Sequence, residues 1–405
     1  MVLQDDKYTV LDLFCGAGGM SEGFLQAGFQ IPFASDYSKE AAETYKNRHR
    51  QLGYDLNFFN DDIGKLTKRS TLINFLEGKS IDVIVGGPPC QGFSLTGKRD
   101  ENDPRNRLFL DYLKIVKIVK PKYFVIENVE GILSYRIKKI TGISGDIYED
   151  EFVPEIIKKE AEKFGYFVDH KLLNAKDYGV PQNRPRVIFF GTRITRSREK
   201  KLLIPNFPEK QAITVSTEDA ISDLRFLKNG EVSTKYNRKY KVTAYQQMLR
   251  SGLTPSAKGE TVKAIDLYNH EASKHQDKTV ERFKKLNTGE SVGQLLKRLS
   301  PEEFEYFNTK KYRCAKLERD AISPTVLTLP DDIIHYDPGN PRILTVREFA
   351  RLQSFDDSFV FLGKRTTGGD KRKFETPQYT QVGNAVPPLF ARAIAKMIMG
   401  AIKGI

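Results

Sequence analysis

Cys90 stands in the segment GPPCQGFS (87–94), whose composition indicates a rigid loop that presents a thiol. The loop follows an apolar run over 81–86, which predicts a buried strand closed by turn residues. Two prolines before the cysteine fix their own dihedrals and bias the preceding residues toward extended geometry. Open α/β sheets bind ligands at the carboxyl ends of their strands. Cys90 is therefore either a reactive thiol or, as most free cysteines are, a buried structural residue.

A glycine-rich turn near the N-terminus, DLFCGAGG (12–19), predicts a backbone that a ligand can approach closely. Asp36 follows the next apolar run, a position where an acid commonly binds ribose hydroxyls. The glycine spacing is not the dinucleotide pattern GxGxxG and no phosphate-binding lysine follows, so we expect an adenosine ligand without phosphates. Asp62 and Ile63 could supply an acid and an apolar wall for the adenine. The alternative is an ordinary strand-to-helix turn.

Two further polar motifs lie next to apolar runs. Glu127 follows the run over 123–126 and is a candidate acid or hydrogen-bond partner one strand along from Cys90. Arg184 and Arg186 precede a strand, and alternate residues of an extended segment point to opposite faces. One arginine could therefore reach into a site while the other braces neighbouring chain. Arginines before a strand are also common without any such role.

Strand and helix patterns alternate over about the first 195 residues, which predicts an α/β fold with a mostly parallel sheet covered on both faces. The expected strands are Tyr8–Phe14, Ile31–Ser35, Ile81–Gly86, Tyr123–Glu127, Tyr166–Leu173 and Arg186–Thr192. The expected helices are Gly19–Ala27, Lys39–Arg48, Arg107–Lys120 and Glu151–Lys163.

This rhythm stops after Arg193, and the following stretch is rich in Lys, Arg, Tyr, Asn and His. We expect a second, smaller and less regular domain there, followed by a helix over 387–405 that is opened by prolines. The expected division is 1–205, 206–374 and 375–405, with the last segment returning to the first domain.

The composition narrows the partners. A net charge of +13 favours a polyanion such as nucleic acid, although lysine-rich proteins without such a partner exist. Cys15, Cys90 and Cys314 are too dispersed for a disulfide framework or a CxxC metal site, so we expect no metal. No transmembrane stretch or signal core is apparent, so we expect a cytoplasmic protein that does not bind membranes.

Taken together, the motifs resemble those of the cytosine-5 DNA methyltransferase family, and the compact chain resembles its bacterial restriction-modification members. The resemblance implies a Rossmann-like, S-adenosylmethionine-dependent methyltransferase sheet, with a target-recognition domain in the middle region. The matching segments, in the order of that family, are DLFCGAGGMSEGF (12–24), GGPPCQGFS (86–94), ENV (127–129), QNRPR (182–186), RExARLQSF (347–355) and QVGNAVPP (381–388).

The resemblance also implies roles for the reactive residues. Cys90 would attack C6 of a cytosine and make C5 nucleophilic, which splits one difficult step into two. Glu127, protonated or sharing a proton, would hold N3. Arg186 would donate to O2, with Arg184 alongside. The C5 carbon would then accept a methyl group from S-adenosylmethionine. The implied cofactor-binding residues are Phe14, Gly16, Gly18, Asp36, Asp62, Ile63, Pro88, Leu108, Asn384 and Ala385.

The implied macromolecular substrate is double-stranded DNA, from which a methyltransferase must flip the target base. We expect the polar segment over 95–106 to close over that base. Arg347 is expected to organise the recognition domain. The chain could work as a monomer, and a restriction endonuclease acting on the same site is a possible partner. The expected DNA-binding residues are Ser94, Lys98, Arg99, Arg105 and Thr325.

Three other functions are compatible with parts of the pattern. An RNA methyltransferase would use the same thiol chemistry, although the residues GFS after PPCQ resemble the DNA branch. A non-catalytic homologue would be expected to lose Cys90, Glu127 or the glycine turn, and all of these are present. A nicotinamide-dependent oxidoreductase would leave GPPCQGFS and QNRPR unexplained.

Overall fold

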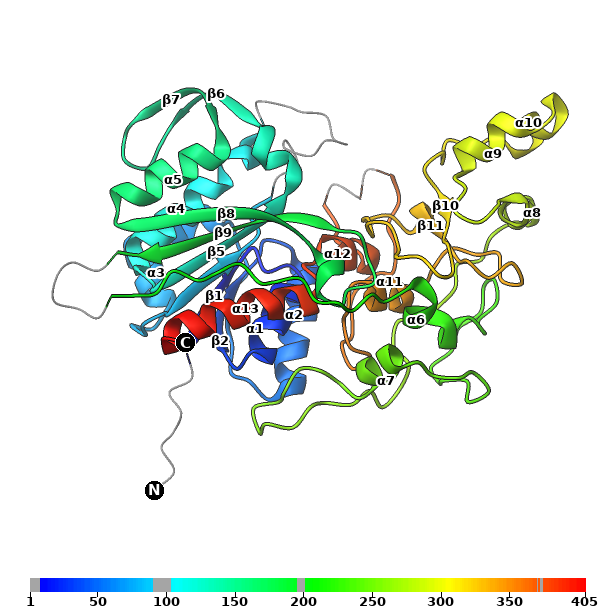
Figure 1. The fold of residues 1–405 in the computed structure, drawn as a ribbon, viewed down its shortest axis with the longest axis horizontal. Coiled ribbons are helices and arrows are strands. Elements are labelled where there is room, and N and C mark those ends of the chain that lie inside the picture. Colours follow the sequence, from blue (N-terminus) through cyan, green and yellow to red (C-terminus); the bar gives the residue numbers. More distant parts are fainter. Residues whose placement is uncertain (1–7, 90–102, 195–200, 370, 372–373) are drawn as a thin grey trace.

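The computed structural model of the chain describes residues 8–89, 103–194, 201–369, 371 and 374–405. Figure 1 shows its central sheet, which has seven strands in the order β3-β2-β1-β4-β5-β9-β8. The first five strands of this order pair in parallel, and β9 and β8 add an antiparallel edge. The predicted α/β class with a mostly parallel sheet is confirmed. The strands are β1 Thr9–Leu13, β2 Gln30–Ser35, β3 Asn57–Phe59, β4 Val83–Gly86, β5 Tyr123–Val129, β8 Tyr166–Asn174 and β9 Pro185–Arg193.

The sheet is buried on both faces, because successive side chains of its central strands point into two different hydrophobic clusters. Val83 and Val85 of β4 belong to one cluster, and Ile84 between them belongs to the other. Helices α1 Gly19–Gln26 and α13 Pro388–Lys403 contribute to the first cluster. The second cluster is completed by α3 Arg69–Phe75, α4 Leu108–Val119 and α5 Val153–Lys163, while α2 Lys39–Leu52 flanks β2.

All six predicted strands and all five predicted helices, including the one over 387–405, are present, with ends shifted by a few residues. The sequence patterns missed β3 and α3, which are short, and also a hairpin of β6 Arg136–Thr141 and β7 Ile147–Phe152. The strands of this hairpin carry mostly exposed side chains, so no apolar run marks them. Helix α5 begins at Val153 rather than Glu151 because β7 occupies the preceding residues.

The strand register places three motif segments at one edge of the sheet. Leu13 at the end of β1 pairs with Gly86 at the end of β4, and Gly86 pairs with Ile126 of β5. The glycine turn after β1, the loop after β4 and Glu127 therefore start at the same level of adjacent strands. This alignment is the structural reason that residues far apart in sequence share one site.

Between β9 and α12, the described residues form only short elements, and this region lies beside the carboxyl ends of the parallel strands in Figure 1. It is less regular than the sheet region, as predicted. Its elements are α6 Thr217–Ile221, α7 Ala244–Arg250, α8 Asp277–Lys285, α9 Val292–Arg298, α10 Pro301–Phe307, β10 Ala315–Lys316, β11 Ile333–Ile334 and α11 Val346–Leu352; α12 Gln378–Asn384 follows.

The segment Gln378–Lys403, which contains α12 and α13, is long and apolar enough to cross a membrane by length and composition. This differs from the expectation that no stretch would qualify. Within the fold, 61% of its most apolar window is buried. Helix α13 packs on α1, where a Cβ at Gly23 would lie 2.4 Å from the Cβ of Ala391. A buried core helix passes the same test, and this contact identifies α13 as one.

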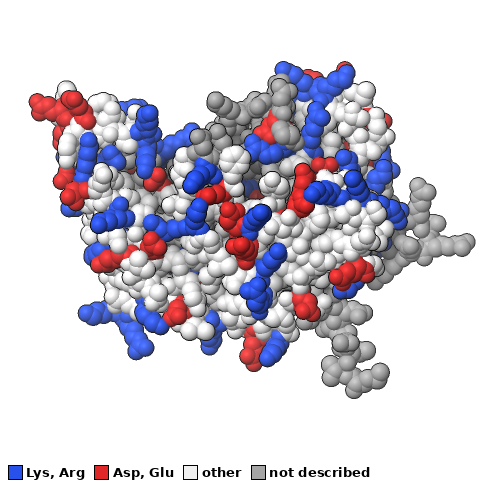
Figure 2. Space-filling view, turned by 180° about the vertical axis from the view of Figure 1, so that it is seen from behind, with Lys and Arg blue, Asp and Glu red and all other residues white. Residues whose placement is uncertain are grey.

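Figure 2 shows that the positive charge is spread over the face seen from behind. Lys and Arg side chains are scattered across that view and interleaved with Asp and Glu, rather than gathered in one patch. The net charge of +13 therefore does not mark this face as the nucleic-acid surface. The position of the cavity described below is more informative.

Buried ion pairs join the two regions and organise the second one. Arg48 of α2 donates to Glu22 of α1 over 2.8 Å and to Asp356 of the second region over 3.2 Å. Arg347 is fully buried and donates to the carbonyl oxygens of Tyr268, Asp356 and Phe359. Two segments, one at Tyr268 and one over 356–359, thus converge on Arg347, which agrees with its expected organising role.

A second buried pair fixes the start of α11. Arg342 donates two hydrogen bonds to Glu348, of 2.7 and 2.8 Å, and both side chains are fully buried. Burial opposes ionisation of Glu348, but the Arg342 charge and hydrogen bonds outweigh it and lower the pKa of Glu348 to about 2. Glu348 also accepts from the N–H of Thr345, which caps the helix.

We predict that Glu348→Gln destabilises the protein by about 3 to 5 kcal/mol at neutral pH, because it leaves the Arg342 charge buried without a counter-ion. The native pKa lies below the ordinary value, so this stabilisation is present above about pH 4.5 and is lost as the pH falls through about 2. Urea unfolding at several pH values measures both effects. Glu303→Gln, which removes an exposed pair with Lys285, is the matched control and should change stability little.

Candidate active site

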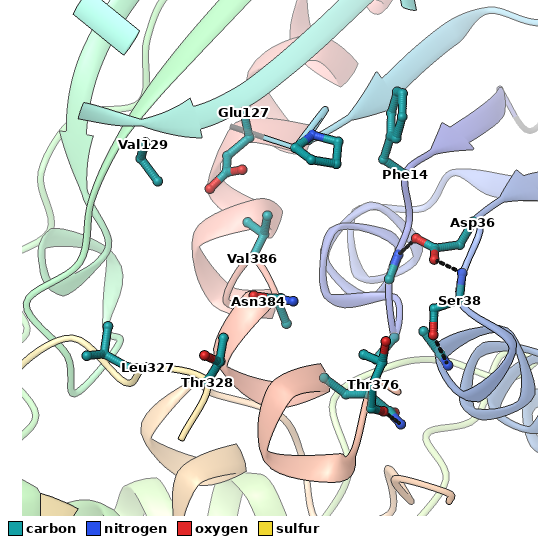
Figure 3. A pocket seen from close by; sticks show the side chains of 18 of the residues that line it. Phe14, Asp36, Ser38, Glu127, Val129, Leu327, Thr328, Thr376, Asn384 and Val386 are labelled. Atoms are coloured by element: carbon teal, nitrogen blue, oxygen red, sulfur yellow. Dashed lines mark hydrogen bonds between the residues drawn. The ribbon is translucent and has the colours of Figure 1, made fainter. Parts of the chain in front are cut away.

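A cavity of about 1230 Å³ lies at the carboxyl ends of the parallel strands. Its walls come from the strand-end loops, from the second region and from the turn between α12 and α13, as Figure 3 shows. Fourteen of the residues singled out in the sequence line it. They are Phe14, Gly16, Asp36, Asp62, Ile63, Pro88, Leu108, Arg105, Glu127, Arg184, Arg186, Thr325, Asn384 and Ala385.

The glycine turn after β1 is shaped by three alternate residues with left-handed φ, Phe14, Gly16 and Gly18, at 55°, 54° and 104°. A Cβ at Gly16 would meet no atom within 4 Å, so this residue leaves open space at the cavity wall. A Cβ at Gly18 would lie 2.9 Å from the ring of Tyr45. Gly18 is not among the lining residues, so glycine is needed there for packing beneath the turn.

Asp36 at the end of β2 joins the glycine turn to the start of α2. Its two carboxylate oxygens accept hydrogen bonds of 2.8 Å from the N–H groups of Gly16 and Ser38, which Figure 3 shows. Burial raises the pKa of Asp36, and the N–H donors partly oppose this shift. A carboxylate has about four acceptor sites, so these two bonds leave capacity for ligand hydroxyls.

The next acid along the cavity is Asp62, whose side chain accepts from the N–H of Gly64 over 2.7 Å and caps a short 3₁₀ turn. Ile63 beside it is 93% buried, and the small part that remains exposed lines the cavity. The neighbouring Tyr37 and Ser38 also line the cavity, and sequence reasoning did not identify them. An apolar side chain beside a polar turn suits a flat heteroaromatic ring.

Asp12 is a further lining residue whose position the sequence did not explain. Its carboxylate is fully buried and accepts a 2.5 Å hydrogen bond from Ser21, which also contacts Tyr45. Burial raises the pKa of Asp12 to about 7, the Ser21 hydrogen bond opposes this, and the Asp36 charge adds to it. Cys15 beside it is buried, and burial raises its thiol pKa, so it packs rather than reacts.

Glu127 and Arg186 form an ion pair on the opposite side of the cavity, with Nε and Oε1 2.8 Å apart and both side chains 12% exposed. They come from the adjacent antiparallel strands β5 and β9. A Cβ at Gly87 would lie 3.0 Å from Oε2 of Glu127, so the loop after β4 approaches the carboxylate closely. Asn128 donates to the carbonyl of Pro88 over 3.1 Å and fixes that loop.

Arg184 has a different environment, although it lies only two residues away. It is buried and donates to the carbonyl oxygens of Val326, Gly383 and Ala385 over 2.9 to 3.2 Å. The side chains of the two arginines thus have different roles, as the alternation of an extended segment predicts. Arg186 pairs with Glu127 at the cavity, and Arg184 holds the main chain of two other segments. Their positions favour Arg184 as a positioning residue.

The expected DNA-binding residues are only partly described. Arg105 pairs with Asp103, to which its Nε donates over 2.8 Å, and Thr325 donates to the carbonyl of Asn183 over 2.6 Å. Ser94, Lys98, Arg99 and also Cys90 lie outside the described residues.

Several further cavity residues were not identified from the sequence. The second region contributes Lys310 to Cys314 and Leu327 to Leu329, and the segment before α13 adds Thr376, Gln381 and Val386. Only the position of QVGNAVPP in the sequence could have suggested the last two. No periodicity or spacing marks the others, because they reach the cavity through long-range packing.

We predict that Gly18→Ala lowers the free energy of unfolding by more than Gly145→Ala does. Both glycines have left-handed φ, 104° and 94°, so each substitution adds about 1 to 2 kcal/mol of backbone strain. A Cβ at Gly145 meets no atom within 4 Å, whereas one at Gly18 collides with Tyr45. Urea unfolding of the two variants measures the difference. Equal losses would contradict the packing role of Gly18.

Comparison with known proteins agrees with this site. The family model described as C-5 cytosine-specific DNA methylase matches residues 8–400. The Type II methyltransferase M.DdeI of Desulfomicrobium norvegicum is 36% identical over 408 residues, which cover 96% of this chain and 88% of that protein. The Type II methyltransferase M1.HphI of Haemophilus parahaemolyticus is 33% identical, covering 96% and 86%.

Solved structures show the same fold. A prophage-encoded E. coli protein, described as a candidate DNA modification methyltransferase, superposes with a TM-score of 0.71 at 25% identity and covers 98% of this chain and 100% of that chain. The Dnmt2 methyltransferase of S. pombe has a TM-score of 0.54 at 18% identity, with 98% and 99% covered, and supports the fold alone. The chain belongs to the C-5 cytosine-specific DNA methylase family and is a DNA cytosine-5 methyltransferase.

Proposed function

We propose that the chain methylates C5 of a cytosine that is flipped out of duplex DNA and attacked at C6 by Cys90. The observation that carries this proposal is the Glu127–Arg186 pair, which lies in the same cavity as the glycine turn and beside Gly87 of the thiol loop. Cys90 follows Pro89, and Pro89 lines this cavity. This adjacency in sequence supports Cys90 as the attacking thiol.

The family implies S-adenosylmethionine as the methyl donor, and the described residues fit it. The open space at Gly16 admits a ligand against the main chain, and Asp36 retains acceptor capacity for ribose hydroxyls. Ile63 and Phe14 offer apolar surface for the adenine, and Asn384 lies across the cavity from Asp36 in Figure 3. The bound cofactor supplies an electrophilic methyl group.

In the proposed reaction, the Cys90 thiolate forms a bond to C6 and the electron pair of the C5–C6 double bond moves onto the ring. Glu127 holds N3 and shares a proton with it, which neutralises the charge that develops there. The nucleophilic C5 would then bond to the methyl group as its bond to the sulfonium sulfur of the donor breaks, so that the donor departs as S-adenosylhomocysteine, and C5 would lose its proton to solvent. The electron pair of the broken C5–H bond re-forms the C5–C6 double bond. The C6–S bond breaks at the same time and releases the Cys90 thiolate, so the enzyme is regenerated.

Arg186 is positioned to serve the same ring. Its Nε is bound to Glu127 and its Nη1 donates to the carbonyl of Pro185 over 2.7 Å. A guanidinium has five N–H donors, so donors remain that can reach the cytosine O2. The ion pair also fixes the orientation of Glu127. Arg184, held by three carbonyl oxygens, keeps the strand that carries Arg186 in place.

For the duplex, we propose that 206–374 is the target-recognition domain, and that 1–205 and 375–405 form the catalytic domain. Thr325 at the cavity wall would support the target strand, and Ser94, Lys98, Arg99 and Arg105 would contact it from the segment after Cys90. Phosphate contacts of this kind position DNA without specifying its sequence. All of these residues belong to one chain, which is compatible with action as a monomer.

The biological role that we propose is protection of cytoplasmic DNA in a restriction-modification system. The support is that M.DdeI and M1.HphI, both matched over almost the whole chain, are named Type II methyltransferases. A partner endonuclease would then cut the same DNA sequence when it is unmethylated.

The first test uses duplex DNA of varied sequence in which cytosine is replaced by 5-fluorocytosine. Fluorine at C5 cannot leave as a proton does, so the covalent intermediate should accumulate. We expect a protein–DNA adduct on a denaturing gel that requires S-adenosylmethionine and is absent with Cys90→Ala. An adduct that persists in Cys90→Ala would refute the thiol assignment. An adduct on structured RNA alone would replace DNA as the substrate.

A second prediction concerns Glu127. Glu127→Gln keeps an oxygen for Arg186 and an N–H for N3 but cannot share a proton with the ring. We therefore expect single-turnover methylation to slow by about 10² to 10⁴-fold while DNA affinity changes little. Rapid-quench kinetics and a DNA-binding titration separate the two quantities. A large loss of affinity at a normal chemical rate would assign Glu127 a purely structural role.

A further inference from the structure

Four consecutive residues of the second region, Lys310 to Arg313, line the same cavity as Glu127 and Arg186. They lie between α10, which ends at Phe307, and β10, which begins at Ala315. No motif in the sequence marks them. This 310–313 segment therefore brings cationic and aromatic side chains to the cavity in which the target cytosine is proposed to bind.

The backbone around the 310–313 segment is anchored. The carbonyl of Tyr312 accepts from the N–H of Gly293 over 2.9 Å, and the carbonyl of Cys314 accepts from Val292 over 2.7 Å. Cys314 is 3% exposed and belongs to a small hydrophobic cluster with residues of α8, α9 and α10. Lys311 pairs with Asp331 over 2.7 Å. The main chain of the 310–313 segment is thus held in place by α9 and by the small hydrophobic cluster.

The other three side chains have no partner within the described part of the chain. Lys310, Tyr312 and Arg313 are exposed there and make no side-chain hydrogen bond or ion pair with another described residue. Tyr312 is 51% exposed. Two unpaired cations and an exposed aromatic ring on an anchored backbone suit a ligand that offers phosphates, base edges and flat ring faces, which is nucleic acid.

We propose that the 310–313 segment reads the DNA beside the flipped cytosine, with Arg313 recognising a guanine of the target sequence. The planar guanidinium can donate two parallel hydrogen bonds to O6 and N7 of guanine, the commonest specific contact in the major groove. Lys310 contacts a neighbouring phosphate, and Tyr312 packs against the DNA next to the vacated position. This inference rests on the proposed function and assigns it a specificity-determining residue.

The test compares wild type with Arg313→Ala, Arg313→Lys and Arg69→Ala. Arg69 is an exposed arginine at the start of α3 that does not line the cavity, so it controls for the loss of one positive charge. Each protein methylates unmethylated genomic DNA, and bisulfite sequencing gives the consensus of the modified sites. Initial rates are measured on an oligonucleotide with the wild-type consensus, and thermal unfolding confirms that each variant is folded.

We expect Arg313→Ala to reduce kcat/KM on that oligonucleotide by about 10- to 100-fold and to lose the requirement for guanine at one position. Arg313→Lys should restore little, because an ammonium cannot form the bidentate contact. Arg69→Ala should keep the wild-type consensus and rate. The wild-type sample tests the proposed function separately. If wild type modifies no cytosine, the proposed function fails, whereas modified cytosines with an unchanged consensus in Arg313→Ala contradict only the readout assignment.

Two results would overturn the readout assignment. An unchanged consensus in Arg313→Ala, with weaker binding on every sequence and a salt dependence reduced by about one charge, would show that Arg313 contacts a phosphate. An unchanged consensus with an unchanged rate would show that the segment does not touch DNA.

Discussion

The guanidinium of Arg184 is the contact on which the assembly of the cavity depends. It binds carbonyl oxygens of Val326, Gly383 and Ala385, which belong to two segments distant from it and from each other in sequence. Gln182 next to it binds the N–H of Val326 and the carbonyl of Leu352. Main-chain carbonyls cannot move independently of their helices and turns. The segment just before and at the start of β9 therefore fixes the cavity walls that the second region and the segment before α13 contribute.

This arrangement separates structure from chemistry within a single short motif. Arg184 is buried and donates to three main-chain carbonyl oxygens, while Arg186 pairs with Glu127 at the cavity and retains donors. The ion pair spans two antiparallel strands, and its position follows from their register. A charged pair placed in this way needs no movement to meet a planar ring, since its supports are strands of the central sheet. Preorganisation of this kind reduces the reorganisation that polar groups would otherwise undergo during reaction.

Local patterns in the sequence predicted the sheet region well, because an apolar run that ends in glycine or proline specifies both a strand and its exit. The glycine turn, Asp36 and Glu127 were found in this way, and their lining of one cavity follows from the strand register. The second region has no such repeat. Tyr312 and Arg313 reach the cavity because the carbonyls of Tyr312 and Cys314 accept hydrogen bonds from α9, and because Cys314 packs in a small separate core. Contacts of that kind depend on tertiary packing, which periodicity does not encode.

The packing of α13 on α1 has a consequence for synthesis of the protein. Helix α1 begins at Gly19, but α13, which covers it, begins at Pro388. The two helices pack so closely that Ala391 leaves no space for a side chain at Gly23. Chains fold as they emerge from the ribosome, N-terminal parts first. The apolar face of α1 therefore stays uncovered by α13 until nearly the entire polypeptide has been translated. A nascent chain in this state exposes apolar surface that favours chaperone binding. The native methyltransferase fold forms only after α13 has been synthesised and has packed on α1.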